Sequence, residues 1–157
     1  HKELERHLLL AYCGNPHESK DINGRWVRQF LGGENRDLWA DIITCTRHFC
    51  EALARRDYQQ AAVHMNRDTA IRRKMTPDVL DKVGERLADI ALQNDCGSRF
   101  TGAGGGGCLW ALGETENIDR LRPLWQELLS SRKEACLLHV GIDSKGVMVN
   151  EDPPKAG

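Results

Sequence analysis

The chain has 157 residues, of which 40% are hydrophobic and 29% charged, and its formal net charge is −1. This composition is typical of one folded domain with its own core, and it excludes disordered and fibrous proteins. Because a balanced charge gives no general attraction to polyanions, we expect no nucleic-acid partner. No apolar stretch approaches the roughly 20 residues that span a bilayer, so we expect no membrane partner.

The six cysteines form no Cys-x-x-Cys pair, and several lie in apolar surroundings. Free cysteine packs as a small hydrophobic residue, so we interpret them as reduced thiols in a cytoplasmic protein without a signal peptide. Cys45, His48 and Cys50 are near enough in sequence to suggest a metal site. Because Cys50 points away from the helix face that Cys45 and His48 share, we favour core cysteines and expect no metal.

The first strand is predicted over residues 8–12, an apolar run that leads into a turn at Gly14 and Pro16. Residues 17–33 are polar and irregular, with a helical pattern around 26–31. Long connections inside compact domains are disproportionately functional, so this segment is a candidate for binding.

Three helices are predicted next. Apolar residues at 38, 42, 45, 49 and 53 indicate the first, with Asp37 as its N-cap. The second extends from Tyr58 to about residue 73. The third begins with Thr76 as N-cap and Pro77 as its first residue, and Gly97 ends it.

Further strands are predicted at 108–112 and 135–142, with a helix over 118–128 between them and Asn117 as its cap. Residues 143–146 form a hairpin turn, and 147–149 the return strand. This order predicts an α+β class: a ferredoxin-like, four-stranded, mainly antiparallel sheet with helices packed on one face and extra helices in the first crossover. Residues 150–157 contain two prolines and little to bury, so we expect a frayed tail.

Residues 101–108 read TGAGGGGC, a run whose four consecutive glycines are costly to order. They favour backbone that side chains forbid, or the close approach of an anionic ligand to N–H groups; a hinge or a tight turn is the alternative. Gly102, Gly104 and Gly107 match G-x-G-x-x-G, but the dinucleotide motif needs a preceding strand and a following helix, whereas here a helix precedes and a strand follows. A Walker A loop ends in Lys-Ser/Thr, and this run ends in Gly-Cys-Leu.

Residues 98–108, SRFTGAGGGGC, resemble the third signature motif of the GHMP small-molecule kinases, which include galactokinase, homoserine kinase, mevalonate kinase and phosphomevalonate kinase. That motif belongs to the C-terminal domain of the family, and the resemblance extends over about residues 5–149. It implies a C-terminal kinase domain at 1–149, most similar to the sugar kinases related to heptose 7-phosphate kinase. Nothing here matches the family's N-terminal domain, so we expect that domain as a partner, no catalytic residue in this chain, and no kinase activity from the chain alone.

The resemblance implies ATP and Mg²⁺ as cofactors, with Mg²⁺ held mainly by the missing N-terminal domain. Carried over to this sequence, the N–H groups near the transferred phosphoryl group belong to Gly102, Ala103, Gly104, Gly105 and Gly106. Phosphoryl transfer depends on positioning and charge stabilisation, which backbone donors supply. A valine at Gly104 is therefore expected to abolish ATP turnover in the full-length enzyme while leaving the fold intact.

The acceptor implied by the resemblance is a sugar or a sugar phosphate, and we nominate as contacts His17, Ser19, Lys20 and Arg99. A solvated polar loop is an equal alternative for residues 15–23, and Arg99 alternatively caps the preceding helix. The basic residues 72–74 either bind an acceptor phosphate or complement the helix dipole, and we favour the dipole. Neither Asp95 nor Asp143 is nominated as a general base; Asp143 opens a turn, where Asp bonds its own backbone.

Two functions of other classes compete with a kinase. One is a ferredoxin-like regulatory or binding module whose glycine loop takes an anionic metabolite. The other is a structural interaction domain whose glycines permit tight helix–sheet packing. Without its N-terminal partner the domain is expected to expose an apolar face, which favours a homo-oligomer.

Overall fold

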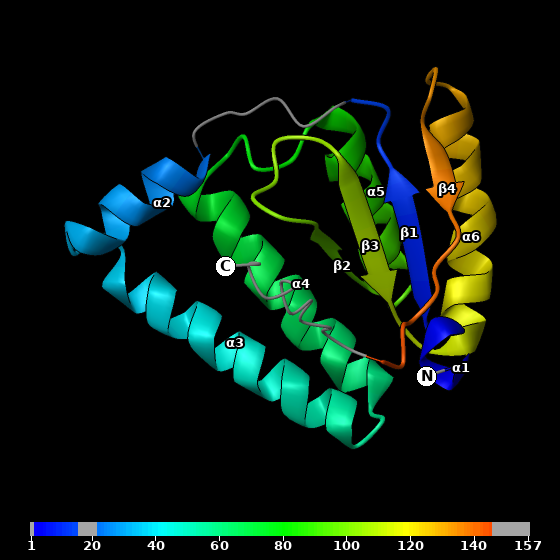
Figure 1. Ribbon diagram of the computed structural model, residues 1–157, viewed down its shortest axis with the longest axis horizontal. Helices are drawn as coiled ribbons and strands as arrows, with labels where there is room; N and C mark the ends of the chain where they lie inside the picture. Colours follow the sequence, from blue (N-terminus) through cyan, green and yellow to red (C-terminus); the bar gives the residue numbers. More distant parts are fainter. Residues whose placement is uncertain (1, 16–21, 146–157) are drawn as a thin grey trace, which may run out of the picture.

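The computed structural model describes residues 2–15 and 22–145 (Figure 1). Its elements in chain order are α1 (Lys2–Glu5), β1 (Leu8–Tyr12), α2 (Ile22–Leu31), α3 (Arg36–Ala54), α4 (Tyr58–Met75), α5 (Lys82–Gln93), β2 (Gly97–Phe100), β3 (Cys108–Leu112), α6 (Thr115–Ser130) and β4 (Cys136–Leu138).

The sheet has the strand order β2-β3-β1-β4, and every neighbouring pair is antiparallel. Helices α2 to α5 all lie in the connection between β1 and β2, and α6 connects β3 to β4. This is the ferredoxin-like arrangement with extra helices in the first crossover, so the predicted α+β fold class is confirmed.

The main core lies between one face of the sheet and helices α5 and α6, which Figure 1 shows behind the strands. Alternate residues of β1 and β3 point toward these helices and are buried: Leu9, Ala11, Leu109 and Ala111. Trp125 of α6 is fully buried, and its indole Nε1 donates a hydrogen bond to the carbonyl of Leu87 in α5 at 3.0 Å. Each large apolar side chain buried in this way stabilises the fold by roughly 1.5–3 kcal/mol.

The other face of the sheet receives α4 at its β2 end. Gly97 is paired with Leu112, so both residues belong to this face. Leu112 packs with Ala61 and Met65 of α4, and a Cβ on Gly97 would lie only 2.7 Å from the Cα of Ala62. The backbones of α4 and β2 therefore touch directly, and α3 packs along the outer side of α4 (Figure 1).

The predicted start of the third helix is wrong. Thr76 is the C-cap of α4, and its hydroxyl accepts a hydrogen bond from the Trp26 indole at 2.7 Å. The chain then turns, and α5 begins only after Asp81, whose carboxylate accepts a hydrogen bond from the N–H of Gly84. Thr76 and Asp81 are both plausible N-caps in the sequence, and the hydrogen bonds that the fold gives each side chain decide between them.

The short strand β2 is absent from the sequence-based assignment, in which Gly97 ended a helix. Four residues, one of them glycine and one serine, carry no strand pattern, and their pairing with β3 determines their structure. The glycine run therefore connects two antiparallel strands. The expected preceding helix is wrong, while the following strand, which excludes the dinucleotide motif, is confirmed.

Several element ends also differ from the predicted ones. The N-cap position is Asn35 instead of Asp37 in α3 and Glu114 instead of Asn117 in α6, and neither side chain makes a capping hydrogen bond. Strand β4 covers only Cys136–Leu138. Of the predicted hairpin turn at 143–146, the structure shows a turn within 143–145, where the N–H of Lys145 donates to the Asp143 carboxylate at 2.8 Å. The expected return strand at 147–149 and the tail lie outside the described residues.

All six cysteines are free thiols. Burial raises the pKa of the Cys13 thiol to about 12 and that of Cys96 to about 11, so both stay protonated at neutral pH. Across residues 2–15 and 22–145, His, Cys, Asp and Glu side chains form no group of three or more that could hold a metal ion. Nor does this part of the chain contain a helix long and apolar enough to cross a membrane.

The contact between Gly97 and α4 predicts a large effect from one added methyl group. Gly97→Ala should lower the free energy of unfolding by about 1–3 kcal/mol, because the new Cβ meets backbone atoms of Ala62 that cannot move independently. Chemical denaturation of the variant measures this. Gly141→Ala is the control, because its Cβ meets nothing within 4 Å; equal stability of the two variants would contradict the packing described.

Candidate phosphate-binding loop

The glycine loop spans residues 101–107, between β2 and β3, and its conformation explains its composition. Gly102, Gly104, Gly105, Gly106 and Gly107 all have positive φ angles, between 63° and 132°. Side chains are strained in this region, so glycine is the residue that adopts it without cost. The run is therefore an ordered loop with a demanding backbone, which disfavours the hinge interpretation.

Backbone hydrogen bonds hold the loop at three places. Where β2 and β3 meet, the N–H of Thr101 donates to the Cys108 carbonyl at 2.9 Å. Near its other end, the N–H of Gly107 donates to the Asn15 carbonyl at 3.0 Å, and the Cys13 N–H returns a bond to Gly107. In the middle, the N–H of Gly105 donates to the carbonyl of Val79 at 2.8 Å. The loop is thus attached to the segments before α2 and before α5.

Asp81 joins the segments on which the loop rests. Its carboxylate caps α5 at Gly84 and also accepts hydrogen bonds from Asn15 at 3.0 Å and from Arg132, after α6, at 3.1 Å. The end of β1, the start of α5 and the end of α6 therefore meet at one half-buried side chain. This arrangement fixes both anchor points of the loop, Asn15 and Val79, relative to each other.

Four loop N–H groups, by contrast, have no acceptor among the described residues: those of Gly102, Ala103, Gly104 and Gly106. Successive N–H groups in backbone of alternating handedness form concavities that bind anionic oxygens. Of the five predicted donors, Gly105 therefore holds the loop in place in this structure. Among the other four, Gly102 is exposed, whereas Ala103 and Gly104 are buried.

Gly104 has a structural role that the sequence does not reveal. A Cβ at this position would lie 2.4 Å from the carbonyl oxygen of Val79. The expectation that Gly104→Val leaves the fold intact is therefore wrong, because any side chain at this position would push the loop away from Val79. At Gly102 a Cβ would meet nothing within 4 Å.

Arg99 does not cap a helix. It lies on β2, on the same face as its partner Trp110 in β3, and it forms an ion pair with Asp68 of α4. The Nε atom of Arg72, one turn further along α4, is 3.1 Å from the same carboxylate oxygen. The structure thus brings together one arginine from the signature motif and one from the basic end of α4.

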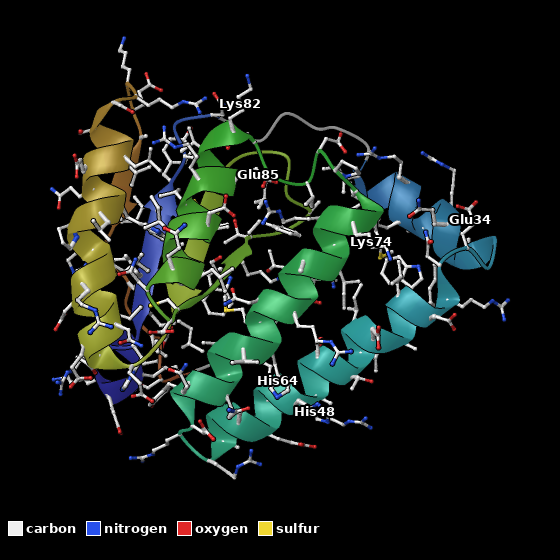
Figure 2. All side chains as sticks on the ribbon, turned by 180° about the vertical axis from the view of Figure 1, so that it is seen from behind. Glu34, His48, His64, Lys74, Lys82 and Glu85 are labelled. Atoms are coloured by element: carbon white, nitrogen blue, oxygen red, sulfur yellow. The ribbon has the colours of Figure 1, made fainter. Side chains whose placement is uncertain are left out.

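The other nominated residues are distributed differently. His17, Ser19 and Lys20 lie outside the described residues. Arg73 forms ion pairs with Glu85 and Asp89 of α5, while Lys74 is exposed. Figure 2 shows Lys74 at the end of α4 and Glu85 in the first half of α5. The basic end of α4 is therefore not one site, because its arginines pair with different elements.

Three residues that position these groups were missed from the sequence: Asp68, Val79 and Asp81. Two had a detectable signal. Asp68 and Arg72 are spaced i, i+4 on a predicted helix, a spacing typical of ion pairs, and Asp81 precedes an amphipathic run as N-caps do. Val79 acts through its carbonyl, which no sequence pattern identifies.

Residues 49–129 match the family described as GHMP kinases C terminal, which is just over half of the chain. The chain belongs to this family. The match includes α4, α5, the glycine loop and most of α6, whereas Asn15 and Arg132, which help to hold the site, lie outside it. The resemblance inferred from the signature motif is thereby confirmed.

Solved structures place the same fold in complete kinases. Phosphomevalonate kinase from Streptococcus pneumoniae is 17% identical with a TM-score of 0.67, over 83% of this chain and 38% of that one. Mevalonate kinase from L. major, in complex with R-mevalonate, is 18% identical with a TM-score of 0.65, over 83% of this chain and 40% of that one. The GHMP domain described here thus spans about two fifths of these proteins. A comparison with curated proteins gave no match.

The contact between the loop and Val79 predicts that two similar substitutions lower the free energy of unfolding by different amounts. Gly104→Ala and Gly102→Ala both force alanine into positive φ, but only the first places a Cβ against the Val79 carbonyl. Gly104→Ala should therefore destabilise the domain by about 2 kcal/mol more than Gly102→Ala. Denaturant unfolding of both variants measures the difference, and similar midpoints would show that the loop does not rest on Val79.

Proposed function

We propose that this chain is the C-terminal half of an ATP-dependent kinase that transfers the γ-phosphate of ATP to a hydroxyl group of a sugar or sugar phosphate. Family membership supports a kinase role. The observation that carries the proposal is the ordered glycine loop, in which four N–H groups donate to no acceptor within residues 2–15 and 22–145.

In this proposal the loop stabilises negative charge on the phosphate oxygens. Phosphoryl transfer spreads negative charge over phosphate oxygens, and donors fixed in advance stabilise that charge without reorganising. The N–H groups of Gly102, Ala103, Gly104 and Gly106 would donate to these oxygens, while the Gly105 and Gly107 bonds keep the loop rigid. No catalytic acid or base is assigned to this chain.

The donor set fits the phosphates of ATP better than it fits a metal ion. Backbone N–H groups bind anions, and the described residues contain no carboxylate cluster for Mg²⁺. We therefore propose that an N-terminal kinase domain supplies the Mg²⁺ ligands and the catalytic residues, in a cytoplasmic enzyme. S. pneumoniae phosphomevalonate kinase, solved with phosphomevalonate and AMPPNP, supports a nucleotide as the second substrate.

The acceptor contacts we propose are His17, Ser19 and Lys20, after β1, together with Arg99 on β2. The exposed apolar side chains of α2 and α3, which include Val27, Phe30, Leu31 and Ile43, support the proposed homo-oligomer.

Steady-state kinetics of the full-length kinase that contains this chain test the proposal. With Mg²⁺-ATP and a panel of sugars, sugar phosphates, mevalonate and phosphomevalonate, we expect ADP release with a sugar or sugar phosphate. Gly102→Asn should lower kcat/KM for ATP by about tenfold or more, because asparagine tolerates positive φ but its side chain obstructs a free N–H donor.

Gly107→Asn is the matched control. Its φ is also positive and its Cβ also meets nothing within 4 Å, but its N–H already donates to Asn15. It should retain activity near that of the wild type. Equal losses in both variants would argue against the loop donors, and turnover restricted to mevalonate or phosphomevalonate would exclude the sugar acceptor.

A further inference from the structure

A cavity of about 220 Å³ lies between the α3–α4 pair and the β2 end of the sheet, away from the α5–α6 core. Its polar lining consists of Thr46, His64, Asp68, Arg72 and Arg99. It is smaller than the roughly 300–1,000 Å³ of pockets that enclose drug-sized ligands, so it suits one end of a metabolite and not a nucleotide.

The cavity contains more positive than negative charge. Arg72 and Arg99 both pair with the single carboxylate of Asp68, and the side chains are only 13%, 24% and 7% exposed. Each guanidinium otherwise lies over an aromatic ring, 5.1 Å from Trp26 for Arg72 and 5.0 Å from Phe100 for Arg99. Among the described residues neither arginine has a second carboxylate partner, so one positive charge is left over.

The other titratable groups that line the cavity, Cys45 and His64, do not neutralise this charge, and nearby Asp41 pairs with Arg67. Burial raises the pKa of the Cys45 thiol, so it carries no negative charge at neutral pH. Burial and the nearby His48 and Arg67 lower the pKa of His64 against the opposing effect of Glu51, so His64 favours its neutral form. Figure 2 shows His48 on α3 facing His64 on α4. Burial also lowers the pKa of both arginines, yet arginine stays protonated at any physiological pH.

A charge left uncompensated in a poorly hydrated site is costly, and an anion relieves that cost. Guanidinium groups bind phosphate and carboxylate oxygens in bidentate geometry, which gives both strength and direction. Phe49 and Trp110 line the cavity as well, and their rings offer an apolar wall for a carbon skeleton.

The position of Arg99 relates the cavity to the loop. Gly102 is three residues further along the chain, so its Cα lies at most about 10 Å from that of Arg99, the distance that a fully extended strand would give. An acceptor held at Arg99 by a charged group would thus reach the loop with its other end. That separation suits a molecule with an anionic group at one end and a free hydroxyl at the other.

We propose that this cavity binds the phosphate group of a sugar-phosphate acceptor through Arg72 and Arg99, with Asp68 orienting both guanidinium groups. The assignment rests on the proposed kinase function and narrows it, because a neutral sugar leaves the surplus charge unpaired.

Equilibrium binding to the chain by calorimetry tests this with three probes: a hexose phosphate, the same hexose without phosphate, and inorganic phosphate. The hexose phosphate should bind at least about tenfold more tightly than the hexose, as expected for hydrogen bonds to charged groups, and inorganic phosphate should compete. Binding of the hexose as tight as that of its phosphate would overturn the proposal. The proposal would also be overturned if inorganic phosphate bound and the hexose phosphate did not.

Arg99→Met should remove the preference for the phosphorylated probe while leaving Asp68 paired with Arg72. Arg73→Met is the control, since Arg73 is on the same helix but pairs with Glu85 and Asp89 outside the cavity; it should retain the preference. If Arg99→Met does not fold, Arg72→Met takes its place, because it leaves the same single pair with Asp68. A folded Arg99→Met or Arg72→Met variant that keeps the preference would contradict the site.

The outcomes separate this inference from the proposed function. Kinase turnover on neutral sugars only, without binding of hexose phosphate, would overturn the anion site and leave the kinase assignment standing. Selective binding of hexose phosphate by a full-length protein that has no kinase activity would overturn the proposed function but support the anion site.

Discussion

The contact between the glycine loop and Val79 is the constraint on which the candidate site depends. The N–H of Gly105 reaches the Val79 carbonyl at 2.8 Å, and no Cβ fits between Gly104 and the same oxygen. A helix through residue 79 would use this carbonyl for its own backbone. The delayed start of α5, at Lys82 instead of Pro77, therefore leaves an acceptor free to hold the loop.

Asp81 extends that constraint to the whole domain. It caps α5 and binds both Asn15 and Arg132, so the two segments that hold the loop share one anchor. Rigid donors are effective because they need no reorganisation when charge develops on a ligand. The fold thus directs its structural hydrogen bonds to Gly105 and Gly107. In the part of the chain that the structure describes, the N–H groups of Gly102, Ala103, Gly104 and Gly106 have no acceptor.

The sequence predicts the parts of this arrangement that local patterns encode. The apolar run of β1, the stripe of α3 and the signature motif sufficed for the α+β class and the kinase family. Strand β2 and the cap of α5 were not predictable in the same way, because contacts from distant residues decide them: pairing with β3 for Gly97–Phe100, and the Trp26 and Gly105 bonds for residues 76–79. The surplus charge at Arg72 and Arg99 likewise appears only when α4 and β2 meet.

The central proposal is that four specific N–H groups of the loop donate hydrogen bonds to phosphate oxygens. Amide chemical shifts of the ¹⁵N-labelled full-length kinase that contains this chain, titrated with a nonhydrolysable ATP analogue and Mg²⁺, report on each N–H separately. The account predicts that the amides of Gly102, Ala103, Gly104 and Gly106 shift, while those of Gly105 and Gly107 keep their bonds to Val79 and Asn15 and move little. Large shifts at Gly105 and Gly107 with none at the other four would contradict it.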